Sequence, residues 1–331
     1  MLFINLCALI DGELQNEPSI TSFSNIVFDA KKISIGDLFI GQKSDIKVAL
    51  ENGAYGIVST TFKVSDNEVA WIKVNNIEVA KLKLLRYLVL KSSKNQIYLN
   101  NIELELFKKL NENRDILYIS DDIETAIRKL LKSDEFECII FENINIFKNL
   151  DLEELDLNIL NPIKVIRHTL FLTSFIYKDT QYKDIKIPKI FIKEFEKVLN
   201  IFDLLNIKYS ISKLTFTSHF KPIFLNNFFK IQPFGTTTKV IIIESDKNLL
   251  EKEINYLKTT ASWAKIALLL PKELENKTRL NIDVELIIFT SYDDLKKKNI
   301  FYYNFAIMVD ENDGFKNYLL KEDLEIKSTL F

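Results

Sequence analysis

The chain has 331 residues, of which 47% are hydrophobic and 27% charged, a composition typical of a folded protein with two or three domains and a sizeable core. Its 44 basic and 46 acidic side chains give a formal charge of −2, which argues against a nucleic-acid binder, because such proteins usually carry a basic surplus. Two cysteines cannot form a disulfide framework and fit a reducing, cytoplasmic setting, and two histidines exclude a histidine-rich metal site.

The first 90 residues are predicted to form a compact α/β unit. Residues 1–10 are apolar, but they are too short to span a bilayer and lack the basic start of a signal peptide, so we expect a first strand there. Further strands are predicted at 26–28, 38–40, 55–58 and 71–74, and helices at 45–52 and 77–90.

Strands and helices alternate again in the rest of the chain, as in a parallel sheet. Between 91 and 235, strands are predicted at 97–99, 116–119 and 138–141, and helices at 103–110, 122–131 and 191–205. From 236 onward, strands at 240–243, 266–270, 284–289 and 305–309 alternate with helices at 248–260 and 292–298. We therefore predict three domains, at 1–90, 91–235 and 236–331.

The seven glycines are unevenly distributed. Four of them are Gly36, Gly41, Gly53 and Gly56, none lies between residues 57 and 234, and none is followed by lysine. Phosphate-binding loops need glycine because their backbone comes close to an anion in unusual conformations. The usual P-loop and dinucleotide enzymes are therefore excluded, and the absence of Gly-x-Ser-x-Gly excludes a standard nucleophile-elbow hydrolase. We expect no cofactor.

The most specific segment is Asp29–Phe39, which reads Asp-Ala-Lys-Lys-Ile-Ser-Ile-Gly-Asp-Leu-Phe. It places an acid and a base just past a strand end, where open α/β sheets bind small ligands. Together with Ala49–Val58, it resembles the N-terminal domain of the Mur ligases, above all the two that add the third residue and the D-Ala-D-Ala dipeptide to the peptidoglycan precursor. The resemblance is good over residues 24–60 and looser over 1–90. It implies an α/β protein of three domains, with parallel or mixed sheets flanked by helices.

In that family the N-terminal domain holds the UDP part of a UDP-MurNAc-peptide. The resemblance implies that a nucleotide-sugar site here would use Asp29, Lys31, Gly36, Asp37 and Gly41. Ala30 and Lys31 stand where the family has serine and arginine, so the two-pronged recognition that arginine provides is lost. The alternative is that Gly36 and Asp37 only form a turn.

The family's central domain opens with a strand and a Gly-x-x-Gly-Lys-Thr loop that holds ATP. The corresponding stretch here reads Gln-Ile-Tyr-Leu-Asn-Asn-Ile-Glu over residues 96–103, without glycine or lysine. Its last residue, Glu103, would repel a triphosphate. We therefore expect neither ATP–magnesium binding nor ATP-dependent amide-bond formation.

The sequence offers further polar residues as candidates for a metal site, a catalytic group or a helix cap. Glu142 resembles the family's magnesium-associated glutamate, but a buried strand that ends in a solvated acid explains it without a metal. His168 lies near the family's metal-associated histidine, but at a shortened spacing. We therefore expect no metal at either residue. His219 is flanked by phenylalanines and is expected to be packed. The polar run after strand 240–243 is expected to cap a helix through Ser245, Asp246 or Asn248.

The sequence thus favours a non-catalytic, Mur-ligase-like protein of a bacterial cytoplasm that binds or scaffolds UDP-MurNAc-peptide precursors of peptidoglycan. Its expected partners are such a nucleotide sugar and a protein of cell-wall synthesis, with no nucleic acid and no membrane span. Two alternatives stay open. One is a divergent, active amide-forming ligase with an unrecognised phosphate loop. The other is a protein-interaction module without a small ligand, docking through the six phenylalanines of 216–234, which we otherwise expect in the core.

Overall fold

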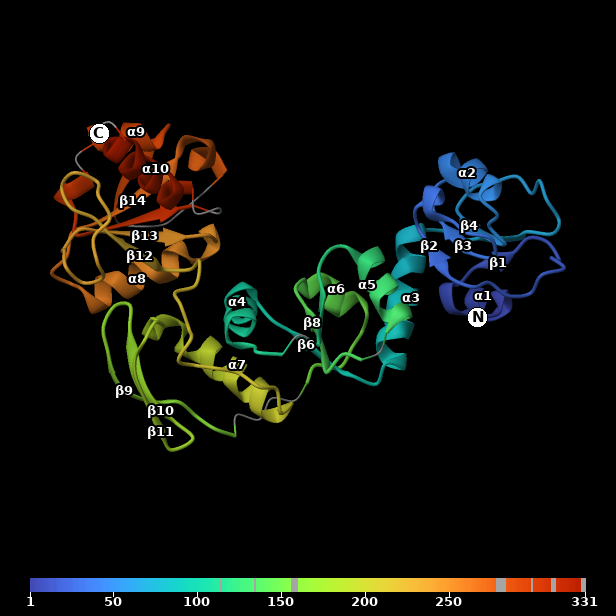
Figure 1. The fold of residues 1–331 in the computed structure, drawn as a ribbon, viewed down its shortest axis with the longest axis horizontal. Helices are drawn as coiled ribbons and strands as arrows, with labels where there is room; N and C mark the ends of the chain where they lie inside the picture. Colours follow the sequence, from blue (N-terminus) through green and yellow to red (C-terminus); the bar gives the residue numbers. More distant parts are fainter. Residues whose placement is uncertain are drawn as a thin grey trace. The chain divides into compact units, whose positions relative to one another are not determined.

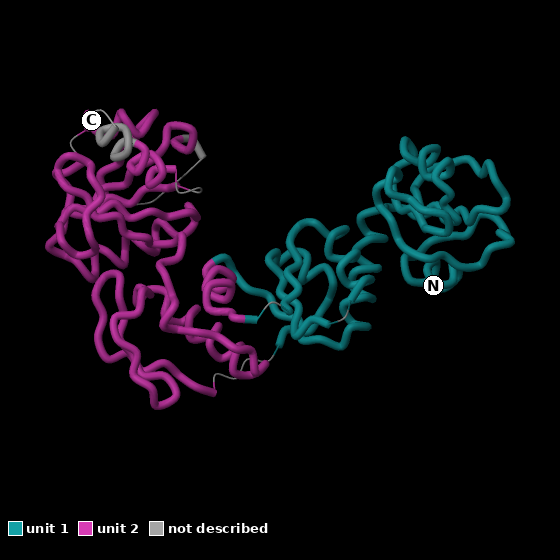
Figure 2. The backbone as a smooth tube through the Cα atoms, viewed as in Figure 1, with its two compact units in different colours: residues 1–101, 113–156 teal, residues 102–112, 157–331 magenta. Residues whose placement is uncertain are grey.

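The structure, a computed structural model, describes residues 1–113, 115–133, 135–155, 160–277, 284–298, 300–310 and 314–328. The chain divides into two compact units, one of residues 1–101 and 113–156 and the other of residues 102–112 and 157–331 (Figure 2). Each unit is described by itself. The described helices include none that is both long and apolar enough to cross a membrane.

The first unit begins with a five-stranded sheet in the order β1-β5-β4-β3-β2 (Figure 1). The strands are β1 (Glu13–Leu14), β2 (Ile26–Val27), β3 (Leu38–Ile40), β4 (Gly56–Ser59) and β5 (Ala70–Lys73). All neighbours are parallel except β1, which runs antiparallel to β5. The helices α2 (Ile46–Glu51) and α3 (Ile77–Lys91) lie between and after these strands along the chain, as the sequence predicted.

The first ten residues correct the sequence prediction, because they form a helix, α1 (Phe3–Ile10), and not a strand. Its buried residues Phe3, Leu6, Cys7 and Ile10 recur at intervals of three and four, which is the spacing of one helical face. Apart from Asn5 the segment is apolar, so the sequence does not show the alternation of polar and apolar residues that identifies a half-buried strand.

A three-stranded parallel sheet, β6-β8-β7, completes the first unit. Its strands are β6 (Asn95–Tyr98), β7 (Ile116–Ile119) and β8 (Cys138–Phe141), followed along the chain by α4 (Asn101–Leu110), α5 (Ile123–Lys132) and α6 (Ile144–Asn149) respectively. Asp122 caps α5 by accepting a hydrogen bond from the Thr125 amide at 3.0 Å.

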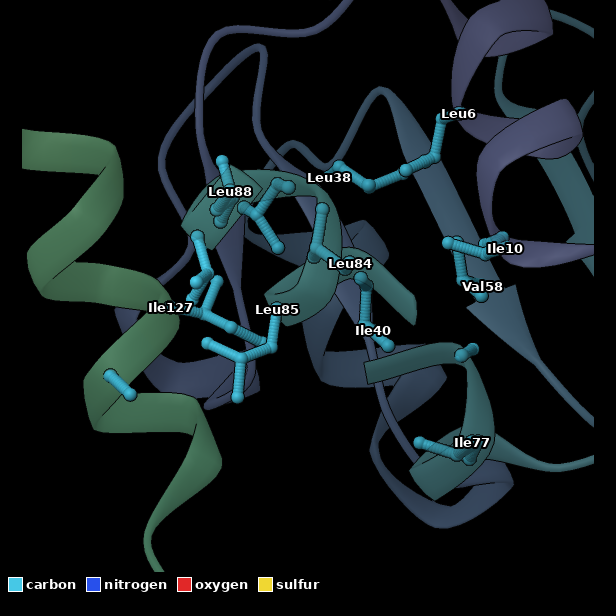
Figure 3. Close-up of a cluster of buried hydrophobic side chains, with 14 of the residues drawn as sticks. Leu6, Ile10, Leu38, Ile40, Val58, Ile77, Leu84, Leu85, Leu88 and Ile127 are labelled. Carbon is cyan, nitrogen blue, oxygen red and sulfur yellow. The ribbon is translucent and has the colours of Figure 1, made fainter. Parts of the chain in front are cut away.

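One hydrophobic core runs through the first unit. It joins α1 and the five-stranded sheet to α3, and continues to α5 and β8. Figure 3 shows Leu84, Leu85 and Leu88 of α3 beside Ile127 of α5, with Leu38, Ile40 and Val58 of the sheet nearby. The helix α3 is therefore packed on both sides, so the core does not stop at residue 90. The division into three domains at 1–90, 91–235 and 236–331 remains a prediction from the sequence.

The second unit, to which residues 102–112 with nearly all of α4 belong, contains an antiparallel sheet to which the sequence analysis assigned no element. It consists of β9 (Lys164–His168), β10 (Thr173–Tyr177) and β11 (Thr180–Ile185), with β10 in the middle. The helix α7 (Ile192–Leu204) follows and buries Phe195, Val198 and Phe202.

The rest of the second unit is a five-stranded sheet in the order β12-β13-β16-β14-β15. Its strands are β12 (Lys221–Phe224), β13 (Val240–Glu244), β14 (Ile266–Pro271), β15 (Glu285–Phe289) and β16 (Phe305–Val309), and only β12 is antiparallel to its neighbour. The helices are α8 (Leu250–Thr260), α9 (Tyr292–Lys297) and α10 (Gly314–Ser328), of which α10 was not predicted. Parallel and mixed sheets flanked by helices confirm the predicted α/β class.

Candidate functional site

The two motif segments of the first unit pack against each other. The Asn52 side-chain amide donates to the Ala30 carbonyl at 2.9 Å, and the Gly36 amide donates to the Gly53 carbonyl at 3.1 Å. Gly36 and Gly53 both have positive φ, at 97° and 91°, so a side chain at either position would strain the backbone. The glycines that the sequence singled out thus join two loops of the fold.

Asp37 is buried within this loop region. Its carboxylate accepts hydrogen bonds from the Asn25 side-chain amide at 2.9 Å and from the Ser34 amide at 3.0 Å. Gly41 is equally constrained, because a Cβ there would lie 2.3 Å from Cζ of Phe39. Both residues therefore have clear structural roles in holding the turn and the packing beside β3.

Asp29 and Lys31 are the predicted site residues that remain exposed to solvent. Asp29 directly precedes a short 3-10 turn (Ala30–Lys32), and its carboxylate accepts the Lys31 amide at 3.1 Å. Lys32 Nζ lies 3.4 Å from the same carboxylate. The amide hydrogen bond, helped by these lysines, lowers the pKa of Asp29. The carboxylate is therefore a charged, accessible acceptor at the end of β2.

At the position of the family's ATP loop, β6 is followed by α4 without any glycine. Glu103 in the first turn of α4 is only 5% exposed, and Lys197 Nζ of α7 lies 3.0 Å from its carboxylate. Glu105, two residues on, accepts hydrogen bonds from the Ser218 amide at 2.9 Å and from its hydroxyl at 2.7 Å. A carboxylate thus occupies the helix start where a P-loop protein would receive a phosphate.

Glu142 and His168 are the two residues that the sequence analysis considered as metal ligands. Glu142 comes directly after β8 and is half-buried. His168 ends β9, and its Nε2 lies 3.3 Å from the Lys189 ammonium. Within the described parts of the chain, no group of three or more histidine, cysteine, aspartate or glutamate side chains is close enough to hold a metal ion.

A buried ion pair in the second unit was not anticipated. His219 is 4% exposed and its Nδ1 lies 2.6 Å from Oε1 of Glu244, the fully buried last residue of β13. Burial alone would lower the pKa of His219, but the hydrogen bond and charge of Glu244 outweigh it and raise the pKa. Glu244 also accepts the amides of Phe220 at 3.1 Å and Asp246 at 2.6 Å.

This pair does not have the geometry of a nucleophile activated by a base. The hydroxyl of Ser245 lies 3.3 Å from His219 Nδ1, the nitrogen that Glu244 already engages, whereas a catalytic triad needs serine and acid on opposite nitrogens. His219 Nε2 faces Glu105 at 4.0 Å. The cluster is therefore a structural junction between the segment before β12 and the end of β13. Its neighbour Asp246 caps the next helical turn by accepting the Asn248 amide, which confirms one of the three caps we expected.

The phenylalanines of 216–234 divide between core and surface. Phe220, Phe224 and Phe229 are buried and Phe216 is half-buried, whereas Phe228 is 82% and Phe234 47% exposed. The expectation that this stretch belongs to the core is therefore correct for part of it.

Comparison with known proteins gives a fold and no closer relationship. No family model matches the chain, and no curated protein matches it. Among solved structures, MurF from Acinetobacter baumannii is similar with a TM-score of 0.55 and 9% identity, over 97% of this chain and 98% of that one. MurF from Thermotoga maritima, solved in complex with ADP, gives 0.52 and 12% over 92% and 98%. A UDP-N-acetylmuramoylalanyl-D-glutamyl-2,6-diaminopimelate–D-alanyl-D-alanyl ligase from A. baumannii gives 0.52 and 9%, over 97% of this chain and 98% of that one. The chain therefore has a Mur-ligase-like fold, as the motif resemblance predicted.

Proposed function

We propose that this protein is a non-catalytic member of the Mur-ligase fold that binds or scaffolds a UDP-MurNAc-peptide in the bacterial cytoplasm, together with a protein of cell-wall synthesis. The fold and the motif at residues 29–58 support the link to the precursor. The observation that carries the non-catalytic part is Glu103, which is buried and paired with Lys197 where the family places its phosphate loop.

The chemistry at α4 supports this proposal directly. A triphosphate–magnesium complex needs backbone amides and a lysine that point at its oxygens. Here the first turns of α4 carry Glu103 and Glu105. The Glu103 carboxylate already pairs with Lys197, and the Glu105 carboxylate already accepts a hydrogen bond from Ser218. A bound triphosphate would have to displace these pairs and lie against two negative charges. We therefore expect no magnesium-dependent ATP binding.

The precursor-binding part rests on the exposed pair Asp29 and Lys31. Asp29 can accept hydrogen bonds from a base or ribose, and Lys31 can supply one charge to a phosphate. A single lysine in place of an arginine fork implies weak affinity, about micromolar to millimolar. The expected ligand is a UDP-MurNAc-peptide and the expected site is the end of β2.

Thermal unfolding in the presence of ligand tests both parts. A UDP-MurNAc-peptide at 100 times its dissociation constant should stabilise the protein by about 2.7 kcal/mol, while ATP with magnesium should produce no magnesium-dependent shift. The double variant Asp29→Ala, Lys31→Ala should lose the precursor shift. The matched control is Lys47→Ala, Glu51→Ala, which removes an exposed acid and an exposed base elsewhere in the same unit and should keep the shift.

Two outcomes would replace the proposal. Magnesium-dependent ATP binding with formation of an amide bond would identify an active ligase. Absence of any shift with UDP-MurNAc-peptides would leave the glycine cluster as turn chemistry and favour a protein-interaction module.

A further inference from the structure

The second unit contains an aromatic cavity that the proposed function does not use. Its volume is about 470 Å³, within the size range of small-molecule sites. It lies between the β9–β10 turn, the end of α8 and the first residues of β13 and β16. Its aromatic walls are Phe171, Phe224, Phe234, Trp263 and Phe305.

The rings of this cavity are arranged edge to face around Phe171. The centroid of Phe171 lies 6.1 Å from that of Phe224 and 6.3 Å from those of Phe234 and Phe305. Two of the wall residues, Trp263 and Phe234, are nevertheless 68% and 47% exposed. Large aromatic faces that stay open beside a cavity can stack on a planar ring, and this stacking is a main source of affinity for nucleobases.

His168 lines the same cavity. Because an ammonium group can only donate, its Nε2 accepts the hydrogen bond from Lys189 Nζ at 3.3 Å. This contact holds the ring in place as part of the cavity wall.

The charge of the lining selects against ionic ligands. Of the described residues that line the cavity, none is a lysine, arginine, aspartate or glutamate, and four are threonines. An uncharged ligand with hydroxyl groups matches this set better than a phosphate does. We propose that the cavity binds a nucleoside, with its base against the aromatic walls.

Fluorescence titration with uridine and with adenosine tests the proposal. The chain has two tryptophans, and Trp71 is buried in the first unit, so quenching would come from Trp263. Calorimetry then compares variants. Trp263→Ala should weaken nucleoside binding at least about fivefold, equivalent to about 1 kcal/mol. Phe228→Ala, which removes an exposed ring outside the cavity, should leave the affinity unchanged.

No response to either nucleoside at roughly 10 mM, which would largely saturate a site with a dissociation constant of about 1 mM, would overturn the proposal. Nucleoside binding that Trp263→Ala leaves intact in a folded variant would overturn it as well. These results are independent of the Asp29 and Lys31 test, because that site lies in the other unit.

Discussion

At the scale of single residues, the second unit fully buries two acidic side chains, Glu244 of β13 and Glu253 of α8. Burial, together with hydrogen bonding to Glu244 and the charges of Glu244 and Asp246, raises the pKa of Glu253 well above its ordinary value of 4.5, and Lys252 offsets this only in part. Folding therefore favours the neutral form of this carboxyl group.

We predict that Glu253→Gln stabilises the protein and that the gain grows with pH. Because the pKa is raised on folding, the wild type loses about 1.4 kcal/mol per pH unit as the pH rises from about 4.5 towards the folded pKa. The glutamine does not titrate and can still donate a hydrogen bond, so it escapes this loss. Urea unfolding of both proteins at several pH values between about 5 and 8 measures the difference.

A neighbouring carboxylate provides the control for this measurement. Glu251→Gln changes an exposed acid on the same helix and should give a nearly constant difference across the pH range. His219 also has a raised pKa, so its contribution is present below about pH 6.5 and is lost as the pH rises through the folded pKa. That contribution occurs in all three proteins and cancels. Parallel curves for wild type and Glu253→Gln would contradict a buried, protonated carboxyl.

At the scale of elements, sequence patterns located the parallel strands best. The segments at 116–119 and 138–141 coincide with β7 and β8, because a strand buried on both faces is a short apolar run between polar ends. The β9–β11 sheet was missed because much of β9 and β11 is exposed and carries no such run. The ion pair of His219 and Glu244 joins residues 25 positions apart, and the aromatic cavity collects side chains from positions 168 to 305. No local pattern encodes either arrangement.

The N-terminal segment allows a test of helix against strand, because the two structures differ in which neighbouring side chains are buried together with Leu6. In a strand, Ile4 and Leu6 would share a face, whereas in α1 Leu6 is fully buried and Ile4 is 70% exposed. We predict that Leu6→Ala lowers the free energy of unfolding by about 2–5 kcal/mol. Ile4→Ala should change it by less than about 0.5 kcal/mol. Similar losses for both variants in urea unfolding would support the strand that the sequence first suggested.

At the scale of the whole molecule, the fold is kept with very little sequence identity. The chain shares 9–12% identity with MurF structures over nearly its full length. What the fold requires is an apolar core in each unit, and each unit has its own, built from α1, α3 and α5 in the first and from β13, β14 and β16 in the second.

Separate cores predict that a core substitution affects mainly its own unit. In a Trp263→Phe background, Trp71 is the sole tryptophan and reports the first unit, while far-UV circular dichroism follows both units. Leu6→Ala should move the Trp71 unfolding midpoint to lower urea concentration, because it leaves a cavity in the core that Leu6 shares with α3. His219→Ala leaves the fully buried Glu244 without its histidine partner in the second unit, a defect of about 3–5 kcal/mol, and should shift part of the dichroism transition while the Trp71 midpoint stays in place. A common shift of both signals in both variants would mean that the chain unfolds as one cooperative body.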